Sequence, residues 1–207
     1  MEFVFNRYNI QEKKLAFVYE EEALSGVKKI ADKVRNDIKL VFSEMPSRIE
    51  HGKEEGLAYP VIFGTIGHSH ILDELNEKGL IRLSDIKGRR EVYSFSLVNI
   101  GPETETALVI AGSDKRGTIY GLFHLSELLK VSPLVDWCDV KPDKMVELVL
   151  NEEINMVSKE PSVKYRGFFI NDEWPAFGNW ATRNFGGFNA GMYEHVFELL
   201  LRLKGNY

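Results

Sequence analysis

The chain has 207 residues, a formal net charge of −5 and apolar side chains at 44% of its positions, enough for one domain with a core and part of another. The acidic balance excludes the basic patch of a nucleic-acid-binding protein. A single cysteine, Cys138, excludes an internal disulfide, and no apolar run approaches the ~20 residues of a membrane span. The first residues lack the pattern of a signal peptide, so we expect a cytoplasmic protein without a membrane partner.

The N-terminal part is predicted to alternate strands and helices. Runs of aromatic and β-branched residues predict strands at 3–5 and 14–19. Apolar residues at helical spacing predict a helix over 21–43, with two glutamates in its first turn. Continuous or alternating apolar runs predict further strands at 59–67, 92–100 and 106–112, and further helices are predicted at 68–79 and 117–130. This order indicates an α/β layer domain over residues 1–158.

The C-terminal part changes character at residue 159. A bridging strand and turn over 147–157 is followed by a predicted strand at 163–171, an aromatic and glycine-rich loop at 172–189 and an apolar helix at 190–204. That helix carries more apolar surface than one strand can cover, and no second strand follows it. We therefore interpret residues 159–207 as the first strand, loop and helix of a truncated (β/α)8 barrel.

The stretch AGSDKRGTIYG, residues 111–121, joins a predicted strand to a predicted helix through a polar turn. The free amides of a helix N-terminus bind anions. A nucleotide P-loop requires lysine directly after its second glycine, however, and the residue after Gly117 is threonine. The alternative is structural: Ser113 or Asp114 caps the turn, and Gly117 and Gly121 allow close helix–strand packing.

The histidines do not predict a metal centre. His68 and His70 are two residues apart and do not share one helix face, and the other three histidines are scattered. No Gly-x-Ser-x-Gly nucleophile elbow occurs. We assign neither a metal nor another cofactor.

The apolar run of residues 168–170 stops at Asn171, Asp172 and Glu173. Residues past the carboxyl end of a barrel strand lie on the face of the catalytic loops, and two carboxylates in different surroundings suit acid–base work on a glycosidic bond. A solvated strand end is the alternative. The aromatic residues that follow suit either stacking on sugar rings or the packing of a long loop: they are Trp174, Phe177, Trp180, Phe185 and Phe188.

Six segments, in this order from about residue 60 onward, resemble the N-terminal portion of glycoside hydrolase family 115: GTIGHSHILDEL, AGSDKRGTIYGLFHLSE, VSPLVDWCDV, SKEPSVKYRGFFINDEWPAF, FGGFN and VFELLLRLKGNY. The resemblance implies an α-glucuronidase that removes (4-O-methyl-)glucuronic acid side chains from xylan. It also implies an N-terminal α/β accessory domain, akin to that of hexosaminidases, before a (β/α)8 catalytic barrel. The chain departs from the family at residues 134–136, Leu-Val-Asp, where members tend to carry a Trp/Tyr-rich segment.

The resemblance implies roles for the three polar residues after the apolar run. Asp172 and Glu173 become candidate catalytic residues and Asn171 a candidate substrate-binding residue, with glucuronoxylan or a glucuronylated oligosaccharide as the partner. Inverting glycosidases hold their acid and base ~6.5–9.5 Å apart, so adjacent residues supply at most one of the two. We expect the other in a missing C-terminal part of the same polypeptide, and we expect the isolated chain to be inactive.

Two other functions remain open from the sequence. One is a non-catalytic α/β module that binds carbohydrate or a protein partner. The other is the accessory region of a hexosaminidase-type glycosidase, which shares this kind of N-terminal domain.

Overall fold

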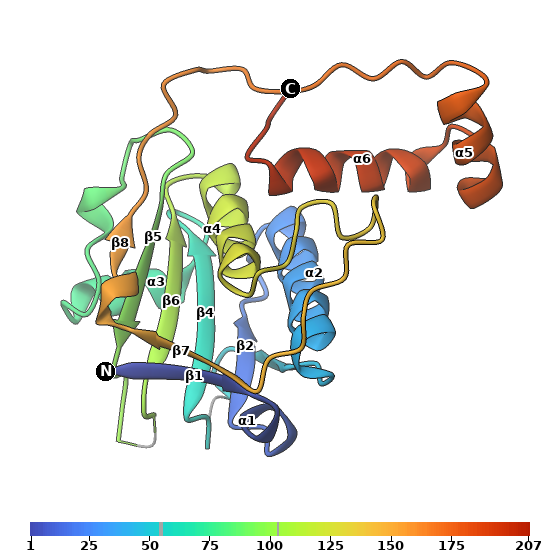
Figure 1. Cartoon of the computed structure of the whole chain (residues 1–207). Coiled ribbons are helices and arrows are strands. Elements are labelled where there is room, and N and C mark those ends of the chain that lie inside the picture. The colour runs from blue at the N-terminus through green and yellow to red at the C-terminus, as the bar shows by residue number, and fades with distance from the viewer. Residues whose placement is uncertain (54–55, 103) are drawn as a thin grey trace. The chain divides into compact units, whose positions relative to one another are not determined.

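The computed structural model describes residues 1–53, 56–102 and 104–207, and the chain divides into two units. Unit 1 consists of Met1–Ser132 and Lys141–Pro161, and unit 2 of Pro133–Val140 and Ser162–Tyr207 (Figure 1). None of the helices in the described ranges has the length and apolarity needed to cross a membrane.

Unit 1 is built on a six-stranded sheet with the order β3-β2-β4-β6-β5-β8. Four neighbouring strands are parallel: β3 (Ser47–Glu50), β2 (Leu15–Tyr19), β4 (Tyr59–Thr65) and β6 (Ala107–Gly112). The other two are antiparallel to their neighbours: β5 (Tyr93–Val98) and β8 (Met156–Val157). A separate two-stranded antiparallel sheet pairs β1 (Glu2–Asn6) with β7 (Glu147–Asn151).

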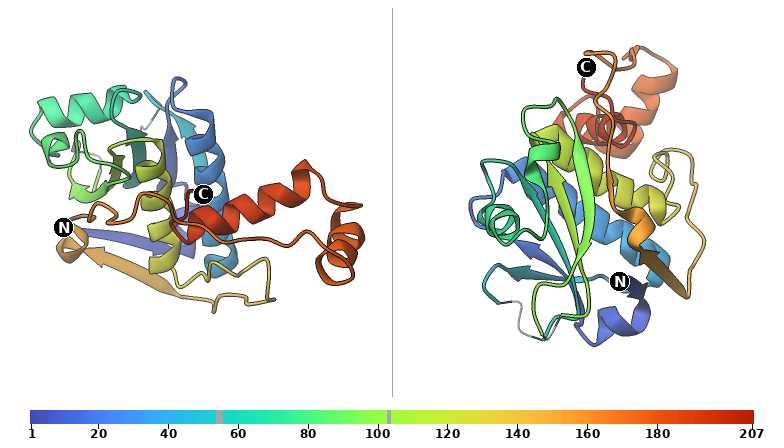
Figure 2. Two further views of the ribbon diagram at one scale, coloured as in Figure 1. Left: turned by 90° about the horizontal axis from the view of Figure 1, so that it is seen from above. Right: turned by 90° about the vertical axis from the view of Figure 1, so that its left-hand side faces the viewer.

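Helices cover both faces of the six-stranded sheet (Figure 2). On one face lie α2 (Ser25–Phe42) and α4 (Lys115–Leu128), and on the other lie α3 (His70–Glu77) and the short 3-10 helix η1 (Leu83–Asp85). Because side chains alternate along a strand, β2 serves both cores. Ala16 and Val18 belong to the cluster that includes Leu72 of α3. Tyr19 faces the opposite way, where its hydroxyl donates to Asp32 Oδ1 of α2 at 2.7 Å.

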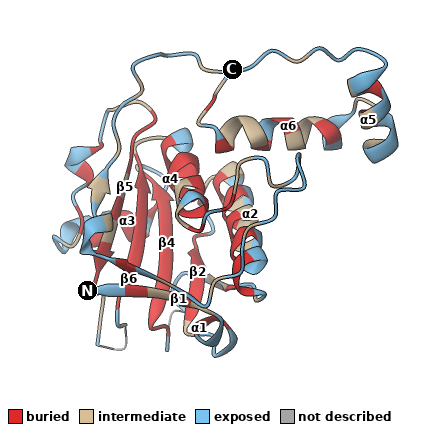
Figure 3. Cartoon of the chain, viewed as in Figure 1, coloured by how far each residue is buried: buried red, intermediate tan, exposed pale blue. Residues whose placement is uncertain are grey.

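The apolar runs predicted as buried strands are confirmed. Every residue of β4 and of β6 is buried (Figure 3), as expected for parallel strands covered on both faces. The predicted helix over 21–43 begins later, at Ser25, so the prediction that Glu21 and Glu22 form its first turn was wrong. Those two residues form a turn directly after β2. Sequence analysis missed β3 and three short helices in unit 1: α1 (Arg7–Gln11), η1 and η2 (Glu152–Ile154).

Unit 2 contains two helices, α5 (Ala176–Phe185) and α6 (Ala190–Arg202). The prediction of a loop over 172–189 was wrong for α5, which ends at Gly186 in the left-handed conformation. The prediction of a strand at 163–171 was also wrong, because no described segment forms a β-ladder with these residues. Their backbone is held instead around Arg166, whose carbonyl accepts hydrogen bonds from the Asn206 and Tyr207 amides.

We expect the phenol of Tyr93 to make unit 1 less stable at high pH. Tyr93 is 5% exposed, and burial, with the nearby charge of Glu127, raises its pKa from 10.0 to about 12. Its unfolded form therefore ionises first, and each pH unit between 10 and 12 lowers the free energy of unfolding by about 1.4 kcal/mol. Urea unfolding from pH 8 to 11 should show this loss. Tyr93→Phe should reduce the loss by the share of one phenol, because burial also raises the pKa of Tyr19 and of Tyr59. Tyr8→Phe, at an exposed position, should leave the loss unchanged. The same pH dependence in the Tyr93 variant would contradict the assignment.

Candidate functional site

The segment before α5 is anchored at its start by Arg166. The guanidinium donates from Nε to the carbonyl of Lys204 at 2.9 Å and from Nη1 to the carbonyl of Val163 at 2.8 Å. The Asn206 side chain accepts from the Arg166 amide at 3.0 Å. The Arg166 carbonyl accepts from the amides of Asn206 and Tyr207, at 2.7 and 3.1 Å. These contacts tie the start of the segment to the residues that follow α6.

Asn171, Asp172 and Glu173 lie further along this segment, and all three are exposed. In the described part of the chain, neither carboxylate makes a hydrogen bond or an ion pair, and the Glu173 carbonyl accepts from the Gly178 amide at 3.0 Å. Asn171 borders a depression of about 290 Å³ whose other lining residues are Trp137, Phe168, Phe169, Ile170, Phe177, Val196 and Leu199. The structure therefore brings Asn171 to an apolar depression and leaves both carboxylates open to solvent. Their catalytic role stays a prediction.

Most of the predicted stacking aromatics pack inside unit 2. Phe177, Trp180, Phe185 and Phe188 surround a small buried cluster of Ala181, Met192 and Val196. Trp180 stacks on Trp137 with ring centroids 5.0 Å apart and on Phe177 at 5.5 Å. The packing alternative is thus confirmed for these four residues.

Trp174 differs from the other four aromatic residues. It is 62% exposed, and its indole covers Gly178, where an added Cβ would lie 2.6 Å from the ring. Trp174 therefore combines a fixed position with an open face, which suits stacking on a sugar ring.

We expect Arg166→Lys to speed hydrogen exchange of the Asn206 and Tyr207 amides about tenfold. Lysine keeps the charge but lacks the planar fork that reaches two carbonyls at once, and hydrogen bonds to charged groups contribute about 1.5–3 kcal/mol. Exchange measured by NMR on the intact chain checks this. Arg183→Lys, an exposed position in the last turn of α5, serves as the matched control and should leave both rates unchanged. Equal rates in the Arg166 variant and the parent would refute the anchoring role.

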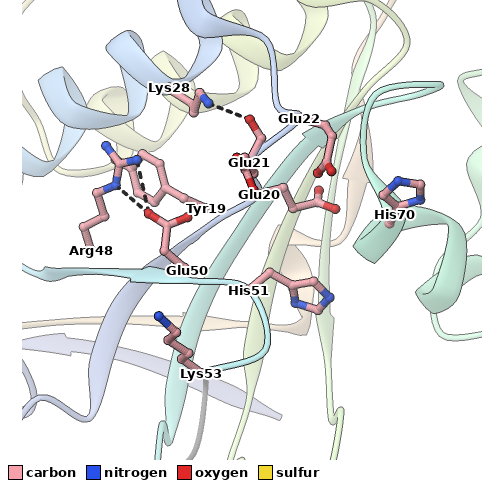
Figure 4. A pocket seen from close by; sticks show the side chains of 10 residues that line it. All are labelled: Tyr19, Glu20, Glu21, Glu22, Lys28, Arg48, Glu50, His51, Lys53 and His70. Carbon is pink, nitrogen blue, oxygen red and sulfur yellow. Dashed lines mark hydrogen bonds and ion pairs between the residues drawn. The ribbon is translucent and has the colours of Figure 1, made fainter.

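Unit 1 contains a larger hollow, of about 580 Å³, at the carboxyl ends of β2 and β3 (Figure 4). Four of its ten lining residues are glutamates, which follow β2 or end β3: Glu20, Glu21, Glu22 and Glu50. His70, at the start of α3, lines it from a third direction. Sequence analysis did not find this hollow, although three consecutive glutamates after a buried strand were a signal.

Glu20 differs from the other lining carboxylates because it is buried, at 4% exposure. Its side chain accepts from the Ser69 hydroxyl and from the Ile71 amide, the latter at 3.0 Å. Ser69 in turn accepts from the Leu72 amide at 3.3 Å and is the N-cap of α3. The amides at this helix start are therefore occupied by the protein's own side chains.

The polar turn in residues 111–121 also has internal partners, which confirms the structural alternative. Asp114 caps α4, accepting from the Gly117 amide at 2.8 Å and from the Glu91 amide at 2.8 Å. An added Cβ at Gly117 would lie 2.2 Å from the carbonyl oxygen of Val92, and one at Gly121 would lie 2.6 Å from Ile110. These glycines let α4 pack closely on β5 and β6.

Comparisons with known proteins give two informative matches. The family model for glycosyl hydrolase family 115 matches residues 158–207, a segment that includes the Asn-Asp-Glu run. The whole chain also resembles a solved structure described as a novel family GH115 4-O-methyl-alpha-glucuronidase, BtGH115A, with specificity for decorated arabinogalactans. That match has a TM-score of 0.77 and 29% sequence identity, and it covers 99% of this chain and 25% of that chain.

A second solved structure, described as CpGH84D, matches with a TM-score of 0.48 and 13% identity, over 74% of this chain and 21% of that chain. None of the curated proteins matches the chain.

Both the family model and the solved structure belong to glycoside hydrolases. Residues 158–207 match glycoside hydrolase family 115, the family that the sequence motifs resemble. The chain spans about a quarter of the length of the solved 4-O-methyl-α-glucuronidase.

Proposed function

We propose that this chain is part of an α-glucuronidase that removes (4-O-methyl-)glucuronic acid side chains from a polysaccharide. The observation that supports this most is the match of 99% of the chain to a solved 4-O-methyl-α-glucuronidase, with a TM-score of 0.77. Because the chain spans a quarter of that protein, the activity in this proposal belongs to a longer polypeptide. Residues 1–158 then form its accessory α/β domain, and residues 159–207 contribute to its (β/α)8 catalytic barrel.

In the proposed mechanism, Asp172 or Glu173 is one half of an inverting pair. A carboxylic acid protonates the glycosidic oxygen, while a carboxylate removes a proton from the water that attacks the anomeric carbon from the opposite face. Such carboxyl groups stand ~6.5–9.5 Å apart across the substrate, which two adjacent residues cannot do. The partner carboxylate therefore comes from another part of the longer polypeptide.

The neighbouring residues supply binding rather than proton transfer in this proposal. The Asn171 amide has both donors and an acceptor, which match sugar hydroxyl groups. Trp174 offers its exposed indole face to the apolar side of a sugar ring.

The proposed substrate is a polysaccharide with a neutral backbone that carries glucuronic acid side chains. The sequence motifs imply xylan as this polysaccharide, whereas the solved relative is described as specific for decorated arabinogalactans. Both substrates share the uronic acid that the enzyme would release, so the reaction proposed here is the same for either.

The test uses a polypeptide that contains this chain and matches the solved relative in length. It should release 4-O-methylglucuronic acid from glucuronoxylan or from glucuronylated arabinogalactan, and ¹H NMR should show the β-anomer first if the mechanism inverts the α-linkage. Early appearance of the α-anomer would contradict inversion. Hydrolysis of an N-acetylhexosaminide without release of glucuronic acid would overturn the proposed activity. Residues 1–207 alone should release no product above a buffer blank.

A further inference from the structure

The hollow of unit 1 lies where open α/β sheets bind ligands. Such ligands sit outside the carboxyl ends of parallel strands, at the strand from which successive connections diverge. In unit 1 that strand is β2, because β3 follows on one side of it and β4 lies on the other. The hollow has about 580 Å³, within the range of about 300–1,000 Å³ that is usual for small-molecule sites.

The charged side chains that line this hollow disfavour an anionic ligand such as a phosphate. The carboxylate of Glu20 already occupies the amide and hydroxyl donors at the start of α3, which is where an anion would bind. Two of the lining cations are also engaged. Lys28 donates to the carbonyl of Glu21 at 2.8 Å, and Arg48 pairs with Glu50 at 3.3 Å.

Apolar ligands and metal ions fit no better. The ring of Tyr19 is fully buried, and the guanidinium of Arg48 lies over it, 4.2 Å from the ring centre. The hollow therefore presents charged and imidazole side chains instead of an aromatic face. Among the residues that the structure describes, no group of three His, Cys, Asp or Glu side chains is placed to hold a metal ion.

The lining side chains include groups that donate and groups that accept hydrogen bonds. Figure 4 shows Glu22, His51 and His70 around one opening, with Lys53 at its rim. Carboxylates accept, ammonium groups donate and imidazoles do both, which together match hydroxyl groups that each donate and accept. We propose that this hollow binds a neutral sugar residue through its hydroxyl groups. Unit 1 would then hold polysaccharide at a site that takes no part in bond cleavage, which goes beyond the proposed glucuronidase activity.

The experiment is an NMR titration of the ¹⁵N-labelled chain, residues 1–207, with xylotetraose in one arm and β-1,3-galactotetraose in the other. We expect saturable shift changes at the amides of Glu22, His51 and His70 in at least one arm. The arm that responds identifies the backbone sugar. Because the readout is binding, a negative glucuronidase assay leaves this proposal standing, and a negative titration leaves the proposed activity standing.

Two substitutions two residues apart provide the comparison. His70 and His68 are both exposed, but only His70 lines the hollow. His70→Ala should weaken sugar binding at least fivefold, and His68→Ala should leave it unchanged, with amide dispersion confirming that both variants fold. Equal affinities in these variants, or no saturable shift in either arm with the parent chain, would overturn the proposal. A response of the same amides to Zn²⁺ but to neither sugar would also overturn it, in favour of a metal site.

Discussion

Replacing one of the two adjacent carboxylates, by Asp172→Asn or Glu173→Gln, is expected to lower kcat about 10²–10⁴-fold, and replacing the other less than tenfold. General acid–base catalysis contributes about this factor, and only one of two neighbours can belong to a pair that stands on opposite sides of the substrate. Both side chains are exposed, so neither amide should disturb folding. The measurement is kcat for release of glucuronic acid by the polypeptide that matches the solved relative in length.

A second substrate shows whether the residue whose replacement lowers kcat is the general acid or the general base. If it is the general acid, an aryl glucuronide should lose less activity, because its leaving group needs no protonation. If it is the general base, both substrates should lose activity equally, since both depend on an activated water. Glu160→Gln, at an exposed carboxylate earlier in the same stretch, is the control and should retain activity. Retention of activity in both the Asp172 and Glu173 variants would contradict a catalytic role for these two residues.

Gly117→Ala should destabilise unit 1 by about 3 kcal/mol or more, the range of severe overpacking. The added Cβ would lie 2.2 Å from the carbonyl oxygen of Val92, and 3.2 Å from its nitrogen. Those atoms cannot retreat easily, because the Val92 carbonyl accepts from the Ser113 amide at 2.8 Å. Alanine is itself favoured over glycine in helices by about 1 kcal/mol. A loss of stability in this variant would therefore come from the steric clash and not from helix propensity. Urea unfolding monitored by circular dichroism measures it.

The matched control for this substitution is Gly101→Ala. No atom lies within 4 Å of a Cβ built at Gly101, so its stability should change by less than about 0.5 kcal/mol. Equal midpoints for the two variants would mean that α4 can shift on the sheet, against the close packing described here.

The core of unit 1 was largely predictable because its strands are buried on both faces. The residues of β4 and β6 form continuous apolar runs, a pattern that parallel strands produce and that sequence shows directly. The edge strand β3 was not predictable in this way, since its four residues alternate between half-buried and exposed. Helix α5 was missed because glycine, asparagine and aromatic residues disfavour helix locally. Packing around Ala181 stabilises it instead.

In the candidate sites, features that depend on neighbouring residues can be read from the sequence, whereas contacts between distant residues cannot. Asp172 and Glu173 became candidates because they interrupt an apolar run within a few positions. The hydrogen bond from the Arg166 amide to Asn206 joins residues 40 positions apart, and neither residue type signals the other. The hollow of unit 1 combines side chains from separate segments, including Glu22, Glu50 and His70, which only the order of the strands brings together.

Strand β1 is synthesised well before β7, the strand with which it pairs. Asn6 and Glu147, which face each other in this small sheet, are 141 residues apart. A ribosome that adds about 5–20 residues per second takes roughly 7–30 s to cover that distance. During this delay, Phe3 and Phe5, both fully buried in the finished fold, emerge without their neighbouring strand. This apolar segment thus waits several seconds for its partner strand, which makes it a natural binding site for a nascent-chain chaperone.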